Sequence, residues 1–137
     1  TIELPASILG LGMPKLAPLK LGGKVAIDIE RLSMNRTSLQ GEVTIRWLAA
    51  SSALLPDFPF GDYELSFRGE DLVSSGVLRT LKGPLLLSGE TSRADDGSPV
   101  MPVLVRVPAQ YQSQLAPLLR MVSVEQGEGL FALQLKN

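Results

Sequence analysis

The segment FGDYELSFRG, residues 60–69, decides the fold class of this chain together with TLKGPLLLSG at residues 80–89. Apolar and polar side chains alternate strictly in the first segment. The apolar set is Tyr63, Leu65 and Phe67, and the polar set is Asp62, Glu64, Ser66 and Arg68. Successive side chains of a strand point to opposite faces of a sheet, so the alternation predicts a strand with one dry and one solvated face. Nothing in either segment supplies chemistry, which favours a scaffold or a binding module.

The composition excludes several classes of function. The chain has 137 residues, enough for about one domain, with 13 basic against 14 acidic side chains and a net charge of -1. The basic residues are scattered, so there is no electrostatic footprint for nucleic acid. Histidine and cysteine are both absent. Their absence removes the commonest general base, thiol nucleophiles, zinc clusters and disulfides, while the cellular compartment stays open.

Glycine- and proline-containing turns recur at intervals of roughly 8–12 residues and separate alternating apolar segments. These segments are Val25 to Ile29, Leu39 to Trp47, Val103 to Val107 and Phe131 to Leu135. The pattern predicts a mainly β fold: an antiparallel curved sheet, a sandwich or a partly open barrel. Only residues 109–122 show helical spacing, and Pro117 interrupts them. Because proline removes a helix hydrogen bond, we expect one short or broken helix there, packed across the sheet.

The first 20 residues differ from the rest. They contain Pro5, Pro14 and Pro18, a density that predicts an extended segment or an edge strand over residues 1–20. Residues 21–137 are expected to form a single β-rich domain. No run of about 18 apolar residues is present, so no membrane span is expected within these residues. Because the chain begins at Thr1 rather than at methionine, we expect it to be a fragment or a processed form, with room for an anchor upstream.

Three elements in a fixed order give the chain a family resemblance. A glycine-containing strand, LQGEVTIRW at residues 39–47, is followed by a proline-bearing loop and the Gly61-Asp62-Tyr63 strand. Then comes LRTLKGPL at residues 78–85, reaching Gly89. In this order and spacing the chain resembles the soluble part of type II secretion system protein N. The resemblance is closest over residues 21–89 and looser beyond them.

The resemblance implies a location, partners and a role. It implies the periplasmic domain of a protein anchored in the inner membrane of a Gram-negative bacterium by an N-terminal helix upstream of Thr1. The implied partners are other type II secretion subunits, namely the inner-membrane protein C and the outer-membrane secretin. The implied role is the export of folded proteins across the outer membrane, without catalysis.

Several residues are candidates for structural or interface roles. The residues of the family pattern are Trp47, Gly61, Asp62, Tyr63, Gly83, Pro84 and Gly89. Trp47 is either an interface anchor or, as a lone aromatic on an alternating apolar face, a core residue. The acidic residues around Asp62 and Glu64 lack the spacing of a calcium loop and are expected to be solvated. We expect no catalytic residue, no metal site and no cofactor.

An exposed sheet edge is the remaining feature with functional promise, because edges recruit strands from partners. The candidate edges are residues 1–12 and the last strand with Phe131, Leu133 and Leu135. The leading hypothesis is therefore a non-enzymatic assembly component of the type II secretion machinery. The alternative is a carrier of a lipid or another apolar ligand on a curved sheet. A carrier predicts an apolar cleft of several hundred Å³, whereas an assembly module predicts a filled interior.

Overall fold

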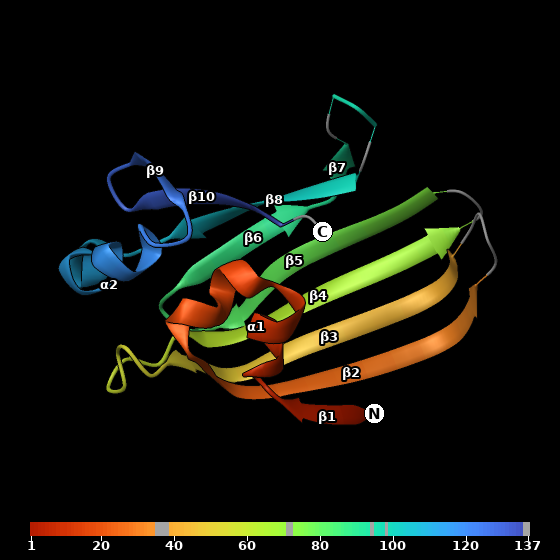
Figure 1. The fold of residues 1–137 in the computed structure, drawn as a ribbon, viewed down its shortest axis with the longest axis horizontal. Coiled ribbons are helices and arrows are strands. Elements are labelled where there is room, and N and C mark those ends of the chain that lie inside the picture. The colour runs from red at the N-terminus through yellow and green to blue at the C-terminus, as the bar shows by residue number, and fades with distance from the viewer. Residues whose placement is uncertain (35–38, 71–72, 94, 98, 136–137) are drawn as a thin grey trace.

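The computed structural model describes residues 1–34, 39–70, 73–93, 95–97 and 99–135. Within this part the chain forms one antiparallel sheet in the order β1-β2-β3-β4-β5-β6-β8-β10-β9, with β7 paired to β8. The strands are β1 (Ile2–Pro5), β2 (Leu21–Met34), β3 (Leu39–Ser52), β4 (Gly61–Glu70), β5 (Val73–Lys82), β6 (Leu86–Glu90), β7 (Ser92–Arg93), β8 (Pro99–Arg106), β9 (Val124–Gly127) and β10 (Leu130–Leu135). The sheet is strongly curved but not closed (Figure 1). The prediction of a mainly β, curved antiparallel sheet is confirmed.

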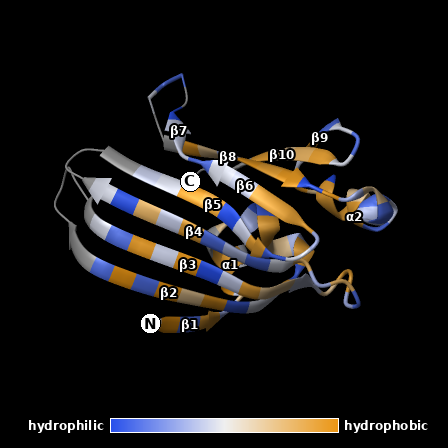
Figure 2. Ribbon diagram, turned by 180° about the vertical axis from the view of Figure 1, so that it is seen from behind, coloured by the Kyte–Doolittle hydropathy of each residue, from blue (hydrophilic) through white to orange (hydrophobic). Residues whose placement is uncertain are grey.

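The predicted strand at residues 60–69 is β4, which lies in the middle of four long antiparallel strands. Its alternation continues across β2 and β3, as the bands of colour along these strands show (Figure 2). The register aligns the apolar side chains into three rows, which are Val25, Trp47 and Tyr63, then Ile27, Ile45 and Leu65, then Ile29, Val43 and Phe67. Exposure rises along β2, from 2% at Val25 to 48% at Ile29. The concave face is therefore dry at one end and open at the other.

The sheet bends where β5 meets β6. The two strands share only the backbone pairs Val77–Glu90 and Leu78–Gly89. Beyond these pairs the Thr80 hydroxyl accepts a hydrogen bond from the Leu87 N–H at 2.7 Å and donates to the Leu87 carbonyl at 2.9 Å. A side chain thus replaces the backbone ladder at the bend. An added Cβ at Gly89 would lie 2.7 Å from the Pro102 carbonyl oxygen, so glycine permits the close approach of β8.

Two helical regions cover the dry end of the concave face, where Val25 is buried (Figure 1). The predicted helix of residues 109–122 is a 3-10 turn, η2 (Ala109–Tyr111), followed by α2 (Gln112–Leu119) with Pro117 inside it. The expectation of a short or broken helix is confirmed. Its apolar stripe is buried in the core and consists of Leu115, Leu118, Leu119 and, just beyond the helix, Val122.

The N-terminal segment, which we expected to be extended or an edge strand, is a strand only over β1. It continues as α1 (Ile8–Gly12) and the 3-10 helix η1 (Pro14–Leu19). Pro14 is compatible with this helix because proline at the first position has no N–H that the helix needs. Leu19 is buried and Leu9 is half-buried. Burial of these side chains against the concave face accounts for helical turns that proline density alone does not predict.

Candidate functional site

Two glycines of the family pattern form a tight corner where the start of β4 meets the turn between β5 and β6. Gly61 has a φ of 138° and Gly83 a φ of 120°, conformations that side-chain-bearing residues rarely adopt. An added Cβ at Gly61 would lie 2.1 Å from the Lys82 carbonyl oxygen, and one at Gly83 would lie 2.4 Å from the Gly61 Cα. Both positions therefore require glycine because two backbones touch there. Pro84 follows, half-buried, within the turn itself.

Asp62 and Tyr63 fasten this corner to its surroundings. One Asp62 carboxylate oxygen accepts a hydrogen bond of 2.8 Å from the backbone N–H of Ala49, which has a φ of 52° at a bulge in β3. The Tyr63 hydroxyl lies 2.6 Å from the Leu85 carbonyl and 2.9 Å from the Phe60 carbonyl, and it has one proton to donate between them. Burial raises the pKa of Tyr63 above its ordinary value. The Asp62 carboxylate and the Tyr63 hydroxyl are therefore hydrogen-bonded to backbone groups of this chain.

Trp47 is half-buried and points into the fold. Its indole N–H donates to the Gly22 carbonyl at 2.9 Å, and its ring centroid lies 5.8 Å from that of Tyr63. The ring lines an apolar cavity rather than standing free on the surface. Gly89, at the bend between β5 and β6, faces another part of the same interior.

The apolar cavity lies between the concave face and the helices. Its volume is about 180 Å³, below the several hundred Å³ that a carrier predicts and above a filled interior. It is lined by side chains from α1, η1, α2 and seven strands. Leu9, Met13 and Leu16 form part of its wall, and sequence reasoning did not identify them. Their spacing of four and then three residues is typical of one helix face and was the signal available.

Asp62 and Glu64 of β4 are paired with basic side chains on the opposite, convex face. Glu64 is buried and accepts hydrogen bonds from Arg79 Nε at 2.9 Å and Arg46 Nε at 3.0 Å. The Arg79 hydrogen bond is the main cause that lowers the pKa of Glu64, so this carboxylate is no proton donor near neutral pH. Asp62 lies 3.7 Å from Lys82 Nζ. Within the described ranges, no three acidic side chains gather in a way that could hold a metal ion.

The last strand, β10, pairs with a strand on both sides for only half of its length. Phe131 is 1% exposed and lies between Val105 of β8 and Glu125 of β9. Leu133 pairs with Val103, and the backbone of Leu135 pairs with Met101. Pairing with β9 ends at Ala132, so no strand of the described chain lies on the other side of residues 133–135. The other end of the sheet is β1, which pairs with β2 only.

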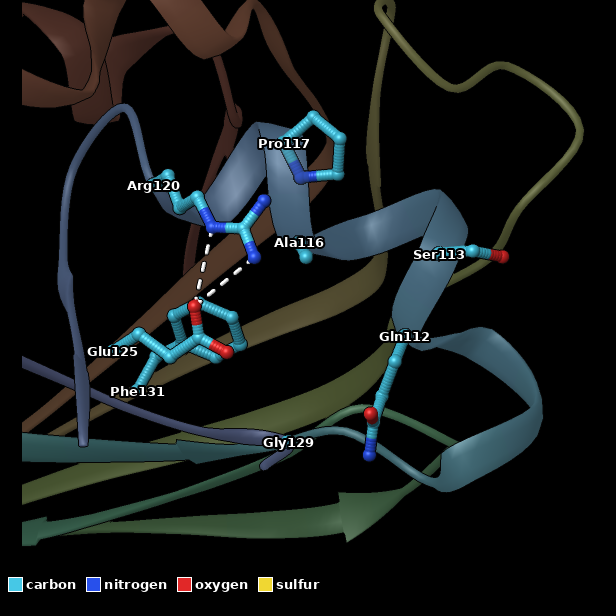
Figure 3. Close-up of a pocket in the computed structure, with 8 residues that line it drawn as sticks. All are labelled: Gln112, Ser113, Ala116, Pro117, Arg120, Glu125, Gly129 and Phe131. Carbon is cyan, nitrogen blue, oxygen red and sulfur yellow. Dashed lines mark hydrogen bonds and ion pairs between the residues drawn. The ribbon is translucent and has the colours of Figure 1, made fainter. Parts of the chain in front are cut away.

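A second pocket, of about 250 Å³, lies where α2, β9 and β10 meet (Figure 3). Its charged residues neutralise each other, because Arg120 donates to one Glu125 carboxylate oxygen through Nε at 3.2 Å and Nη2 at 3.0 Å. Gln112 fills the space beside Gly129, where an added Cβ would lie 2.4 Å from the Gln112 Nε2. The pocket thus has no unpaired charge in its lining to select a ligand.

Comparison with known proteins assigns the chain to a family. Residues 1–134 match the model of the family described as type II secretion system (T2SS), protein N. No curated protein and no solved structure gives a significant match. Among the described residues, no helix has the length and apolar character needed to cross a membrane. Because the family match extends over nearly the whole chain, this protein belongs to the type II secretion system protein N family, a component of that secretion machinery.

Proposed function

We propose that this domain is a non-enzymatic assembly component of the type II secretion machinery, acting in the periplasm in the export of folded proteins across the outer membrane. In this proposal the domain is tethered to the inner membrane by an N-terminal anchor. Its partners are the periplasmic domains of the inner-membrane protein C and of the outer-membrane secretin. The observation that carries the proposal is the family match over residues 1–134.

The arrangement of the polar residues supports a role without catalysis. The family-pattern residues Gly61, Asp62 and Tyr63 interact with backbone groups of this same chain, as their hydrogen bonds and close contacts indicate. Glu64 is held charged between two guanidinium groups. What such a domain offers to a partner is its backbone and its surface.

The free edge of β10 is the surface that we propose for a partner strand. Residues 133–135 have a neighbouring strand on one side only among the described residues. An extended segment of a partner can add there through main-chain hydrogen bonds, with little demand on its sequence. Phe131 lies outside this surface because β9 already covers it, so we confine the edge to Leu133, Gln134 and Leu135.

Proline substitutions at adjacent positions test this edge with a built-in control. Along a strand the backbone N–H groups point alternately to the two sides, so Leu133→Pro and Gln134→Pro remove N–H groups on opposite sides. The bond from the Val107 N–H to the Gly129 carbonyl sets the register, so Leu133→Pro breaks a hydrogen bond to β8, removes a side chain from the cavity wall and loses stability. Gln134→Pro removes an N–H from the free edge and keeps the wild-type melting temperature. The stable variant is the test protein.

Binding is measured by calorimetry against the periplasmic domains of protein C and of the secretin, with an unrelated folded β domain as control. Saturable wild-type binding that the stable proline variant loses supports both the role and the edge. Wild-type binding that this variant retains overturns the edge alone. The absence of wild-type binding to either domain contradicts the proposed partners.

A further inference from the structure

We propose that the apolar cavity beneath α1 and η1 binds the end of a single hydrocarbon chain, such as the acyl chain of a fatty acid or of a phospholipid. The cavity holds about 180 Å³. An apolar cavity of roughly 150 Å³ in a protein interior stays free of water and takes up a ligand of the size of benzene. The space here is thus sufficient for a short length of aliphatic chain.

The lining selects hydrocarbon over peptide. Its two polar side chains are already satisfied, since the Tyr63 hydroxyl reaches the Leu85 and Phe60 carbonyls and the Trp47 N–H donates to the Gly22 carbonyl. In the described part of the chain, no buried side-chain nitrogen or oxygen lacks a hydrogen-bond partner. A peptide segment carries an N–H and a C=O at almost every residue, and each would stay unpaired in this cavity at considerable cost. An aliphatic chain has no such groups.

The apolar surface continues from the cavity to the open end of the concave face. Val25, which lines the cavity, is 2% exposed, and Ile29 on the same face is 48% exposed. Val43 and Phe67 pair with each other beside Ile29 and are half-buried. A chain whose end occupies the cavity can therefore lie along these side chains and leave its polar head in water. We infer that the ligand enters from the Ile29 end.

Trp47 provides a direct measurement, because it lines the cavity and is the single tryptophan of the chain. The probes are a straight-chain fatty acid brominated near its terminal carbon, used below its micelle concentration, and vesicles of phosphatidylcholine with brominated acyl chains. Bromine quenches tryptophan fluorescence only at short range. The proposal predicts saturable quenching, with competition by the same fatty acid without bromine. The two probes distinguish a free fatty acid from a membrane lipid as the source of the chain.

Filling the cavity provides the specificity test. Leu65 is half-buried and lines the cavity, so Leu65→Phe reduces its volume. Excluding about two methylene groups weakens binding roughly tenfold. Leu104→Phe is the matched control, because Leu104 is 45% exposed and lies on the opposite face of β8 from the cavity residues Val103 and Val105. Ile45→Phe replaces Leu65→Phe if the latter does not fold, as judged by circular dichroism.

The outcomes separate cleanly. Quenching by either probe that is weakened by Leu65→Phe and unchanged by Leu104→Phe supports the site. Absence of quenching by both probes overturns it, and so does quenching that is equal in all variants, which indicates adsorption to the surface. The inference does not rest on the proposed secretion partners, because the experiment uses the purified domain alone.

Discussion

Replacing Gly61 by alanine tests the reasoning about the corner most directly. The substitution adds one methyl group at a residue with a φ of 138°, 2.1 Å from the Lys82 carbonyl oxygen. A side-chain-bearing residue in such a sparsely populated region costs about 1–3 kcal/mol. The displaced backbone adds further strain, because a methyl group and a carbonyl oxygen cannot approach so closely. We expect Gly61→Ala to lower the free energy of unfolding by about 3 kcal/mol or more.

Two other glycines separate the cost of the positive φ from the cost of the close backbone contact. Gly97 has a φ of 86° but no neighbour within 4 Å of an added Cβ, so Gly97→Ala should cost only the conformational strain of about 1–2 kcal/mol. Gly127 has neither a positive φ nor such a neighbour, so Gly127→Ala should be close to neutral. The expected order of loss is Gly61, then Gly97, then Gly127.

The assay is urea unfolding followed by far-ultraviolet circular dichroism, together with thermal melting. For a chain of this length roughly 3 °C of melting temperature corresponds to 1 kcal/mol, so Gly61→Ala should melt about 10 °C lower. An added Cβ at Gly83 would meet Gly61 itself, so one displacement of the backbone relieves both close contacts. The variant with both alanines should therefore lose less free energy of unfolding than the sum of the two single losses. A Gly61→Ala protein within 1 kcal/mol of Gly127→Ala would refute the argument from close backbone contact.

Two further substitutions probe the polar groups of β4. Tyr63→Phe removes the hydroxyl that serves the Leu85 and Phe60 carbonyls and should cost about 1–2 kcal/mol in urea unfolding; an unchanged stability would mean that these carbonyls find other donors. Glu64→Gln should cost only about 1 kcal/mol at pH 7, because water screens its arginine partners, whose side chains are 41% and 63% exposed. Since the fold lowers the pKa of Glu64, its stabilisation is present above the unfolded-state pKa of about 4.3 and is lost as the pH falls through the lower folded-state pKa. Unfolding from pH 7 to pH 2 should therefore show a smaller loss of stability in Glu64→Gln than in the wild type, and parallel curves would contradict this.

The sequence predicts the strands well where a single physical cause acts locally. The alternation of Tyr63, Leu65 and Phe67 gives both the strand and the face that it buries, because the period of a strand is independent of its neighbours. The corner required more than local information. That Gly61 and Gly83 touch follows from the meeting of two segments about twenty residues apart, and a glycine in a sequence does not identify its opposite backbone.

The helical turns between Ile8 and Leu19 are a case in which a local sequence pattern predicted the wrong conformation. Three prolines in the first 20 residues predicted an extended chain, but Pro14 opens a 3-10 helix and Pro18 is tolerated within it. The apolar cavity depends on those turns and on the bend at Thr80, where a hydroxyl replaces backbone pairing. The spacing of Leu9, Met13 and Leu16 indicates a helical turn but not how far that turn covers the concave face, and the bend at Thr80 has no local pattern at all. The volume of the interior could therefore not be predicted.

Leu133 connects the two proposals physically. Its backbone belongs to the free edge of β10, and its side chain lines the apolar cavity. A partner strand that adds at this edge fixes the backbone of Leu133, and a hydrocarbon chain in the cavity contacts the same residue from inside. Two ligands that order one residue influence each other's affinity, and the influence is equal in both directions. A domain that binds a partner at the edge and a hydrocarbon chain in the cavity therefore couples the two events through Leu133, whereas binding at β1 would leave the cavity wall formed by β10 untouched.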